Sequence, residues 1–436
     1  MEFKSDATQE TEKRIFLSRI LFSICMISLL VILILFRLVQ LQIFDTDKYK
    51  LRSMNNTIRT HSLPATRGLI YDRNNQILAE NQPVFQLEMI PEQIKDIELT
   101  LNGLIQLSLI NEKKLDSIRN NINKNYQFKS IVLNNKLTEK QMAVFANNRT
   151  EFKGVDIKAR LSRHYPKKEI TAHALGYVGT ISSNDYNVFD PSLYTGQEQI
   201  GKTSIERDYE RLLHGKPGSE KVLVNVRGRV MESLGKKPFL PGKNLILTID
   251  TKLQEVAYEA MKDRKGAVVG IDPSNGEILI LVSTPSYDPN LLSQGMTALE
   301  YKAFEKNEGK PLFNRAIAGQ YPPGSVIKPM LGLAGLHLGF IDPTKYEPCN
   351  GVFFLPNYSR PFNDWRTHGP VNLKEAIQAS CDVYFYKTAV RMGIENMSDF
   401  LSKFNLGATT EIDIGQEKTG IIPNPSWKKN NFKSKE

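Results

Sequence analysis

Residues 311–329 read PLFNRAIAGQYPPGSVIKP, and residues 380–386 read SCDVYFY. The first stretch holds Ser325 and Lys328, three positions apart, directly after a Pro-Pro-Gly sequence. On a helix, residues at this spacing share a face with Cβ atoms roughly 5–6 Å apart, so the lysine amine can reach the serine hydroxyl without tertiary assembly. A serine hydroxyl is a weak nucleophile that needs such a base. The pair, followed by the second cluster, indicates a serine acyl-transferase.

The flanking residues predict that Ser325 opens a helix. The Pro-Pro-Gly sequence stops the preceding chain, and Pro329 fits only a first helical turn, where its missing N–H would have no partner. The apolar run MLGLAGLHLG from Met330 should continue the helix into a core. A serine at the positive end of a helix dipole lies where an oxyanion is stabilised.

The composition points to a membrane surface rather than to nucleic acid. The chain has 436 residues, enough for two or three domains, and a formal net charge of +10, which suggests an acidic partner. Its basic residues are scattered, with no stripe interleaved with aromatic residues and no glycine-rich phosphate loop, so we expect no nucleic-acid partner. Anionic lipid is the partner that the N-terminus favours.

A membrane anchor is predicted near the N-terminus. Seventeen residues without a charge or a proline, ILFSICMISLLVILILF, run from Ile20 to Phe36, long enough to span a bilayer. Lys13, Arg14 and Arg19 precede them, which predicts a cytoplasmic N-terminus and export of the chain after about residue 43. No small-residue cleavage site follows. We therefore expect a cytoplasmic tail at residues 1–19 and an uncleaved signal anchor at residues 20–42.

The exported part changes texture near Pro241-Gly242, which we interpret as a domain boundary. Before it, the patterns predict a hairpin in residues 63–90, a helical accessory subdomain at about 93–150, β-structure at 155–182, a helix at 204–213 capped by Gly215, and a strand at 221–230. After it, they predict a strand at 244–250, a helix at 252–262 and a hairpin with its turn at 272–276. Strands beside helices indicate an α/β catalytic domain over 241–436.

These motifs, taken in order, resemble the class B penicillin-binding proteins, and among them the penicillin-binding protein 2 type of rod-shape elongation. Besides the anchor and the two opening stretches, the likeness rests on RGLIYDRNNQILAEN at 67–81, GKTSIERDYERLLHGKPG at 201–218 and LTIDTKLQ at 247–254. Enzymes of the division type usually carry Ser-x-Asn in the second motif. Ser380-Cys381-Asp382 is similar to the elongation type.

The resemblance implies an α/β (α+β) penicillin-binding transpeptidase domain behind an extended mixed β/α pedestal of the dimerisation type at 43–240. It also implies site roles, with Ser325 as the acyl nucleophile and Lys328 as its base. Ser380 and Asp382 would shuttle protons and hold the substrate. The implied function is that of an inner-membrane peptidoglycan D,D-transpeptidase that acts in the periplasm and is acylated by D-Ala-D-Ala stem peptides and by β-lactams. The implied protein partners are a SEDS-type glycosyltransferase and elongation scaffold proteins.

A possible metal site lies close to the second motif. Cys349, Asp364, His368 and Cys381 fall within 33 residues, and two thiolates, an imidazole and a carboxylate form a set that zinc accepts. Their spacing is not that of a zinc finger, but some members of the elongation family hold a structural zinc here. A disulfide between the two cysteines and a set of uninvolved residues are the alternatives. The third cysteine, Cys25, lies in the predicted anchor.

The family's third motif, Lys-Thr/Ser-Gly on a strand beside the nucleophile, is expected far beyond the second. Lys418-Thr419-Gly420 spells it only 38 residues after Ser380, in a polar and proline-rich context, so we interpret it as a chance match. We accordingly expect this chain to be C-terminally truncated within the domain and to react weakly with penicillin. The alternative function is a non-catalytic, membrane-anchored interaction protein of the elongation machinery. The long pedestal and the anchor disfavour a β-lactamase or a β-lactam sensor.

Overall fold

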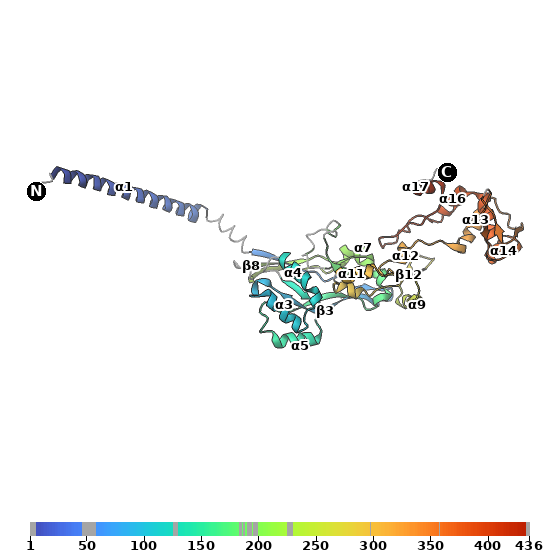
Figure 1. Cartoon of the computed structure of the whole chain (residues 1–436), viewed down its shortest axis with the longest axis horizontal. Helices are drawn as coiled ribbons and strands as arrows, with labels where there is room; N and C mark the ends of the chain where they lie inside the picture. The colour runs from blue at the N-terminus through green and yellow to red at the C-terminus, as the bar shows by residue number, and fades with distance from the viewer. Residues whose placement is uncertain are drawn as a thin grey trace. The chain divides into compact units, whose positions relative to one another are not determined.

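The computed structural model describes residues 6–45, 58–124, 130–182, 185, 188–189, 194, 199–224, 230–296, 298–356 and 358–432. The chain divides into two compact units, the first made of residues 1–64 and 217–240 and the second of residues 65–216 and 241–436 (Figure 1). The chain therefore crosses between the units after Pro64, after Lys216 and after Leu240. The last crossing coincides with the Pro-Gly sequence that marked a boundary.

The first unit contains helix α1 (Asp6–Val39), a π-helical turn η1 (Gln40–Phe44) and a three-stranded sheet. Residues Lys13–Phe44 are long and apolar enough to cross a membrane, and none of this stretch is buried. In the antiparallel sheet, β8 (Gly218–Val224) lies between β1 (Ile58–Leu63) and β9 (Val230–Lys237). The strand predicted over 221–230 is thus the end of β8 and the first residue of β9. Its residues 225–229 lie outside the described part.

The second unit begins with the predicted hairpin. Strands β2 (Ile70–Tyr71) and β3 (Ile77–Met89) pair antiparallel, and the Asp72 carboxylate closes their turn by accepting the N–H groups of Asn74 and Gln76, both at 2.8 Å. The remaining strands of this sheet are β4 (Ile131–Asn134), β5 (Val155–His164) and β10 (Leu245–Ile246). The order is β10-β2-β3-β4, with β5 paired along β3, and only β10 and β2 run parallel.

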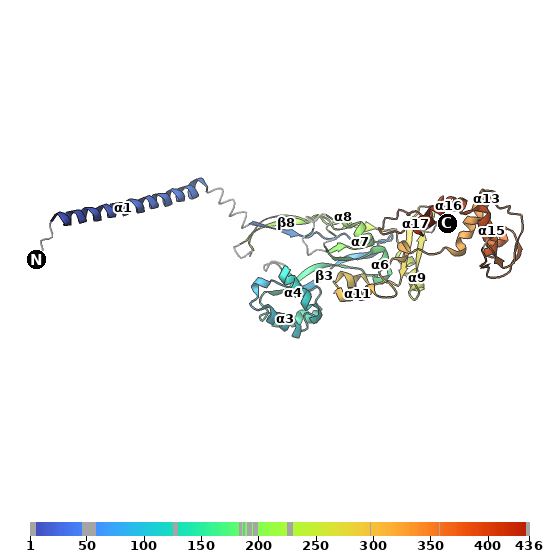
Figure 2. The same ribbon diagram turned by 45° about the horizontal axis from the view of Figure 1, so that its top comes forward.

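The accessory subdomain is helical, as predicted, with strand β4 as an addition. Helices α3 (Ile97–Gln106), α4 (Leu115–Lys124) and α5 (Glu139–Asn148), with the 3₁₀ turns η2 (Pro91–Gln93) and η3 (Glu112–Lys114), gather beside β3 (Figures 1 and 2). Leu101 and Leu104 of α3 and Phe145 of α5 form its core with Leu87 and Leu133 of the strands. The apolar faces of the helices and of the strands thus pack into one core.

Short elements follow β5 and lead to a second core. They are η4 (Lys168–Ile170), α6 (Ala172–Leu175), β6 (Val178–Thr180), β7 (Gln199–Gly201), α7 (Ser204–Asp208) and α8 (Glu210–Leu213). The single helix predicted over 204–213 is therefore broken at Tyr209. Gly215 has φ +76°, which suits its predicted capping role because glycine has no Cβ to clash in that conformation.

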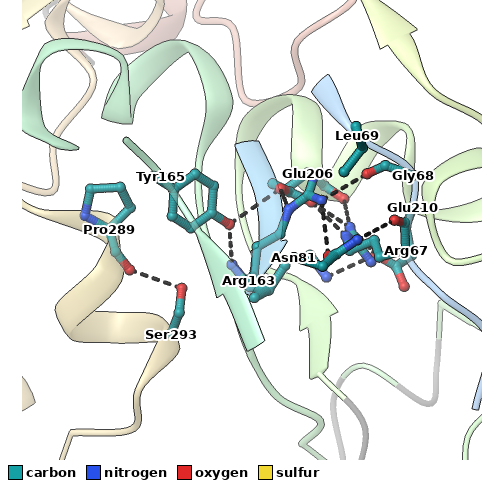
Figure 3. Close-up of polar contacts among 12 residues, drawn as sticks. Arg67, Gly68, Leu69, Asn81, Arg163, Tyr165, Glu206, Glu210, Pro289 and Ser293 are labelled. Carbon is teal, nitrogen blue, oxygen red and sulfur yellow. Dashed lines mark hydrogen bonds and ion pairs between the residues drawn. The ribbon is translucent and has the colours of Figure 1, made fainter. Parts of the chain in front are cut away.

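Helices α7 and α8 are fastened to the sheet by buried charges (Figure 3). The Glu206 carboxylate, fully buried, accepts hydrogen bonds from Arg67 Nε (2.7 Å), Arg163 Nε (2.7 Å) and Tyr165 Oη (3.2 Å). Arg67 also pairs with the buried Glu210 at 2.7 Å. Burying a charge is costly unless it is paired and hydrogen-bonded, and here two arginines meet two glutamates.

Close backbone approaches tie the three crossing segments together beside these charges. The N–H of Gly68 donates to Leu213 O and that of Gly242 to Thr66 O, both at 2.8 Å. A Cβ on Gly68 would lie 2.0 Å from Lys243 O, and one on Gly242 would lie 1.8 Å from Leu213 O. Only glycine fits at these two positions.

The part of the chain after residue 250 begins as predicted. Helix α9 (Thr251–Met261) precedes the antiparallel hairpin of β11 (Gly266–Ile271) and β12 (Ile278–Thr284). The predicted strand over 244–250 is shorter and is limited to β10. Helices α10 (Pro289–Ser293), α11 (Ala298–Glu305) and α12 (Arg315–Ala318) then lead to the stretch that holds Ser325.

A helical group follows. It comprises the 3₁₀ turn η7 (Gly324–Ile327) and helices α13 (Lys328–His337), α14 (Leu373–Gln378), α15 (Asp382–Met392), α16 (Ile394–Ser402) and α17 (Pro425–Asn431). Two small antiparallel pairs, β13 (Glu347–Cys349) with β16 (Gly369–Val371) and β14 (Val352–Phe353) with β15 (Phe362–Asn363), lie between α13 and α14 in sequence. Their core includes Ile341, Leu373, Val383 and Phe385.

We predict that Glu206→Ala destabilises the protein by about 3–5 kcal/mol at pH 7, because it leaves two buried arginines without their shared carboxylate. Burial raises the pKa of Glu206, but Arg163 and Arg67 lower it by more, so the net shift is below the ordinary value of 4.5. Its stabilising contribution is therefore present above pH 4.5 and is lost as the pH falls through the folded pKa.

Urea unfolding of the wild type and of Glu206→Gln between pH 7 and pH 3 measures this effect. The difference in the free energy of unfolding between the wild type and Glu206→Gln should become smaller as the pH falls. Glu98→Gln is the matched control, because Glu98 pairs with Arg119 on an exposed surface and should matter little. Equal effects of the two substitutions at pH 7 would contradict the prediction.

Candidate active site

The structure brings Ser325, Lys328, Ser380 and Asp382 together. Lys328 Nζ donates to Ser380 Oγ at 3.0 Å and to Ser380 O at 2.7 Å, and it forms an ion pair with Asp382 Oδ1 at 2.6 Å. Ser380 Oγ in turn donates to Ser325 Oγ at 2.8 Å. The four side chains form one continuous series of polar contacts, from the Asp382 carboxylate to the Ser325 hydroxyl.

Three helix starts position these groups. Ser325 lies in η7, the 3₁₀ turn that runs directly into α13, and Lys328 is the first residue of α13. Asp382 is the first residue of α15, directly after the Cys381 N-cap. Pro329 occupies the first turn of α13, as predicted from its missing N–H.

Ser325, the candidate nucleophile, and Lys328, the candidate base, differ in burial. Ser325 is exposed, whereas Lys328 is only 7% exposed. The ammonium group also lies 5.8 Å from the centroid of the Phe385 ring. A substrate can therefore reach the serine while the lysine stays within protein contacts, where electrostatic interactions are stronger than in water.

One detail differs from the expectation of direct contact between Ser325 and Lys328. The hydrogen bonds of Lys328 Nζ go to Ser380, whose hydroxyl lies between the amine and Ser325 Oγ. The spacing of three residues places both groups on one face, but a residue 52 positions further along the chain from Lys328 provides the link. Local periodicity holds no information on such a distant side chain.

Ser380 has an unusual backbone. Its φ is +54°, a left-handed conformation that is uncommon for residues other than glycine and costs of order 1–3 kcal/mol. The ends of α14 and α15 impose it, because Ser380 N–H donates to Ile377 O at 3.1 Å and Cys381 N–H donates to Ala376 O at 2.9 Å. The turn aims the Ser380 hydroxyl at the gap between Lys328 and Ser325.

The proposed metal ligands also converge. One donor atom from each of Cys349, Asp364, His368 and Cys381 lies within 4.8 Å of the others. The Asp364 carboxylate is 3.4 Å from Cys349 Sγ and 3.3 Å from His368 Nε2, and both cysteines are fully buried. No disulfide joins the two cysteines in this structure, and their Sγ atoms lie 2.6 Å apart.

The protonation preferences of these groups suit a cation. Burial raises the pKa of Asp364, but the Val383 N–H and the two thiols lower it by more, to about 2. Burial and the neighbouring Cys349 thiol raise the pKa of Cys381, so its thiolate is unfavourable without a positive charge nearby. Two sulfurs, one nitrogen and one oxygen in a buried pocket match the donor set and number of a structural zinc site.

The Lys418-Thr419-Gly420 sequence is not part of a strand, in agreement with its interpretation as a chance match. Its backbone contacts the chain before the nucleophile instead. Lys418 N–H donates to Ile317 O at 3.0 Å, and Gln320 Nε2 donates to Thr419 O at 2.7 Å.

One residue next to the site was not foreseen. The Trp365 indole N–H donates to Ala379 O at 3.2 Å, directly beside Ser380, and the Arg366 guanidinium stacks 4.4 Å from the Trp365 ring. Trp365 is 63% exposed, so its ring faces solvent close to Ser380. The only sequence signal was its position after the candidate ligand Asp364.

Comparison with known families agrees with this arrangement. Residues 62–247 match the penicillin-binding protein dimerisation domain, and residues 266–435 match the penicillin binding protein transpeptidase domain. The combination defines a class, the penicillin-binding proteins with a transpeptidase domain behind a dimerisation domain.

Individual relatives narrow the class. The chain is 38% identical to the peptidoglycan D,D-transpeptidase MrdA of Acinetobacter baumannii, over 98% of this chain and 64% of that protein. It is 37% identical to MrdA of Escherichia coli K12, over 97% of this chain and 68% of that protein. The chain thus spans about two thirds of the length of these relatives.

Two solved structures are similar. The penicillin-binding protein 2 of Helicobacter pylori in complex with MreC gives a TM-score of 0.75 at 30% identity, covering 86% of this chain and 71% of that one. The penicillin-binding protein 2 of Pseudomonas aeruginosa in complex with WCK 5153 gives 0.61 at 32% identity, covering 86% and 63%. The chain belongs to the MrdA, or penicillin-binding protein 2, family.

Proposed function

We propose that this protein is a membrane-anchored peptidoglycan D,D-transpeptidase of cell elongation. The observation that carries the proposal is the series of contacts from Asp382 through Lys328 and Ser380 to the exposed Ser325. This series connects a nucleophile to a base and the base to a counter-charge, which is what acyl transfer by a serine needs.

Ser325 attacks the carbonyl carbon of the penultimate D-alanine of a stem peptide. In the structure Lys328 is an ammonium paired with Asp382, so Lys328 must release one proton before it can act as a base. The Ser325 proton then moves to Ser380 Oγ as the Ser380 proton moves to the lysine amine, and both hydrogen bonds reverse their direction. Asp382 then stabilises the ammonium group that has formed, at 2.6 Å. The tetrahedral oxyanion develops near the N-terminus of α13, where the helix dipole is positive.

Collapse of this intermediate breaks the peptide bond. The departing D-alanine amine takes a proton from Lys328 through Ser380, and an ester joins Ser325 to the stem peptide. The amine of a neighbouring strand attacks that ester, loses its proton along the same path, and restores the serine. A β-lactam acylates Ser325 in the same way, but its leaving nitrogen stays attached because the bond that breaks is part of a ring.

The location follows from α1 and its flanking charges. Lys13, Arg14 and Arg19 lie on the N-terminal side of the apolar stretch, which supports a cytoplasmic N-terminus and periplasmic domains at the inner membrane. An inner-membrane anchor places the exposed Ser325 on the side where peptidoglycan is built.

The two matched domains are a dimerisation domain and a transpeptidase domain, and the strands to be crosslinked require a separate polymerising activity. We propose a SEDS-type glycosyltransferase for this role. An elongation scaffold protein is a second proposed partner, since the Helicobacter pylori relative has been solved as a complex with MreC.

We also propose that Cys349, Asp364, His368 and Cys381 hold one structural zinc ion. When bound, zinc supplies a crosslink and accepts no substrate. Cys381 is the N-cap of α15 and adjoins both Ser380 and Asp382, so the ligand set holds the turn on which the second motif depends. Asp364 Oδ2 already accepts the Val383 N–H at 3.0 Å, which ties the same turn from the other side.

The acylation prediction uses the tagged gene product in membranes of the producing cells. Fluorescent penicillin should label the 436-residue chain only weakly, and Ser325→Ala should abolish that label because Ser325 carries the attacking hydroxyl. Ser402→Ala, at the end of α16, is the control and should label normally. If a version extended to the full length of the MrdA relatives also stays unlabelled, the alternative of a non-catalytic interaction protein is favoured.

A second prediction tests the relay. Ser380→Ala should lower the second-order rate constant of acylation by about 10²–10⁴-fold, the range of general acid–base catalysis. Ser380→Gly should lose as much, although glycine removes the strain of the left-handed backbone. Stopped-flow kinetics measure the effect of the lost hydroxyl on acylation, and thermal melting measures the effect of the relieved backbone strain on stability. A glycine variant that acylates at the wild-type rate would exclude the hydroxyl from proton transfer.

The zinc prediction concerns the metal content of the purified protein. Purified protein should contain about one zinc ion per chain by atomic emission, and Cys381→Ser should lose most of it. Cys25→Ser is the matched control because Cys25 lies in α1, far along the chain from the ligands. Metal-free protein with a Cys349–Cys381 crosslink in mass spectrometry would refute the site.

A further inference from the structure

Helices α7 and α8, together Ser204–Leu213, have two functional faces, and we call this stretch the coupling segment. One face carries Glu206 and Glu210, which are buried against the arginines of the sheet (Figure 3). The other face carries Asp208 and Tyr209, whose polar atoms are not used in that network. They contact a part of the chain about 200 residues further on.

That part is residues 412–419, here called the bridge segment. Tyr209 Oη donates to Asp413 Oδ2 at 2.6 Å, and Gly415 N–H donates to Asp208 Oδ2 at 2.7 Å. The hydrogen bond to Asp413, with burial as the second cause, raises the pKa of Tyr209 to about 12, so the phenol keeps its proton and remains the donor at neutral pH.

Apolar packing holds the bridge segment in the same place. Ile414, between the two polar contacts, is only 6% exposed and lies in one core with Ile205 of α7 and Leu281 of β12. Ile412 and Ile317 pack against this core. A Cβ on Gly415 would lie 3.0 Å from Asp208 Oδ1, so the Asp208 carboxylate sits directly against the bridge backbone.

The far end of the bridge segment contacts the chain that leads to the nucleophile. Lys418 N–H donates to Ile317 O and Thr419 O accepts from Gln320, at 3.0 and 2.7 Å. Gln320 precedes Ser325 by five residues, and Pro322 and Pro323 stiffen the interval. In Figure 1 the chain beyond α16 runs back toward α12, which ends at Ala318.

We propose that Asp208 and Tyr209 are positioning residues for the acylation of Ser325. By holding the bridge segment against the coupling segment, they fix the chain between α12 and η7 and hence the place of Ser325 relative to Ser380. The inference rests on the proposed transpeptidase function and assigns it two further residues. Neither touches the reacting atoms, so their effect passes through the bridge segment.

This geometry explains why the coupling segment is fastened so firmly. The coupling segment can fix the position of the bridge segment only if it is itself held rigidly, and the buried ion pairs of Glu206 and Glu210 hold it. Reactive groups displaced by as little as about 1 Å lose about 10²-fold in rate, so an anchor several residues away can matter without contacting the substrate.

The test is a double-mutant cycle on Tyr209 and Asp413, measured as the rate constant of penicillin acylation at saturation and as the apparent affinity. Tyr209→Phe should lower the acylation step by about threefold to tenfold, the kinetic equivalent of one lost hydrogen bond, and leave the affinity nearly unchanged. Asp413→Ala should do the same. The double variant should lose no more than either single variant, because the two residues act through one bond.

Rescue and control variants exclude a general loss of stability. Asp208→Ala should lower the acylation step, whereas Asp208→Asn, which keeps an acceptor for Gly415 N–H, should restore most of it. Arg211→Ala, on the exposed side of α8, should leave the rate unchanged. Melting temperatures of all variants are compared, and losses of rate that follow the melting temperature instead of the cycle would overturn the proposal.

The outcomes keep this inference apart from the proposed function. Wild-type protein that is labelled at Ser325, with unchanged rates in Tyr209→Phe and Asp208→Ala, would refute the positioning role alone. Wild-type protein that is not labelled even when extended to the full length of the MrdA relatives would refute the transpeptidase assignment and this inference with it.

Discussion

The carboxylate of Glu206 is the contact on which the second unit depends. It joins Arg67, which lies just after one crossing point between the units, to Arg163 of β5 and to its own helix α7. A buried carboxylate without its partners is strongly destabilising, so Glu206 needs both arginines in place. The Glu206 carboxylate therefore links the sheet, the segment after the first crossing and the coupling segment. One of these arginines, Arg163, also donates to Gly68 O at 2.7 Å, beside the close backbone approaches of Gly68 and Gly242.

The candidate active site uses a second kind of constraint, strain held by neighbouring helices. Ser380 adopts a left-handed backbone because α14 ends and α15 begins within two residues of it. That conformation places one hydroxyl between Lys328 and Ser325. The Asp364 carboxylate, one of the four proposed metal ligands beside the turn, accepts the Val383 N–H just after it. The Trp365 indole N–H donates to Ala379 O just before Ser380. Several weak restraints thus support one unfavourable torsion angle.

Much of the local structure could be predicted because its causes are local. The Asp72 turn, the 272–276 turn, helix α9 and the helical start at Ser325 all depend on residues within a few positions of each other. The errors have equally physical causes. The helix over 204–213 breaks at Tyr209, and the strand over 244–250 shrinks to two residues, because tertiary contacts override weak propensity over such short stretches.

The sequence by itself determined the apolar span of α1, the proximity of Ser325 to Lys328 and the order of motifs that identifies the family. These follow from composition and from spacings of a few residues, which chain geometry alone converts into structure. Only the tertiary structure decided that Ser380 lies between Lys328 and Ser325, that Glu206 meets an arginine 139 residues away, and that Tyr209 reaches Asp413. Such meetings depend on which cores pack together, and no local pattern of residues encodes the partner on the far side of a core.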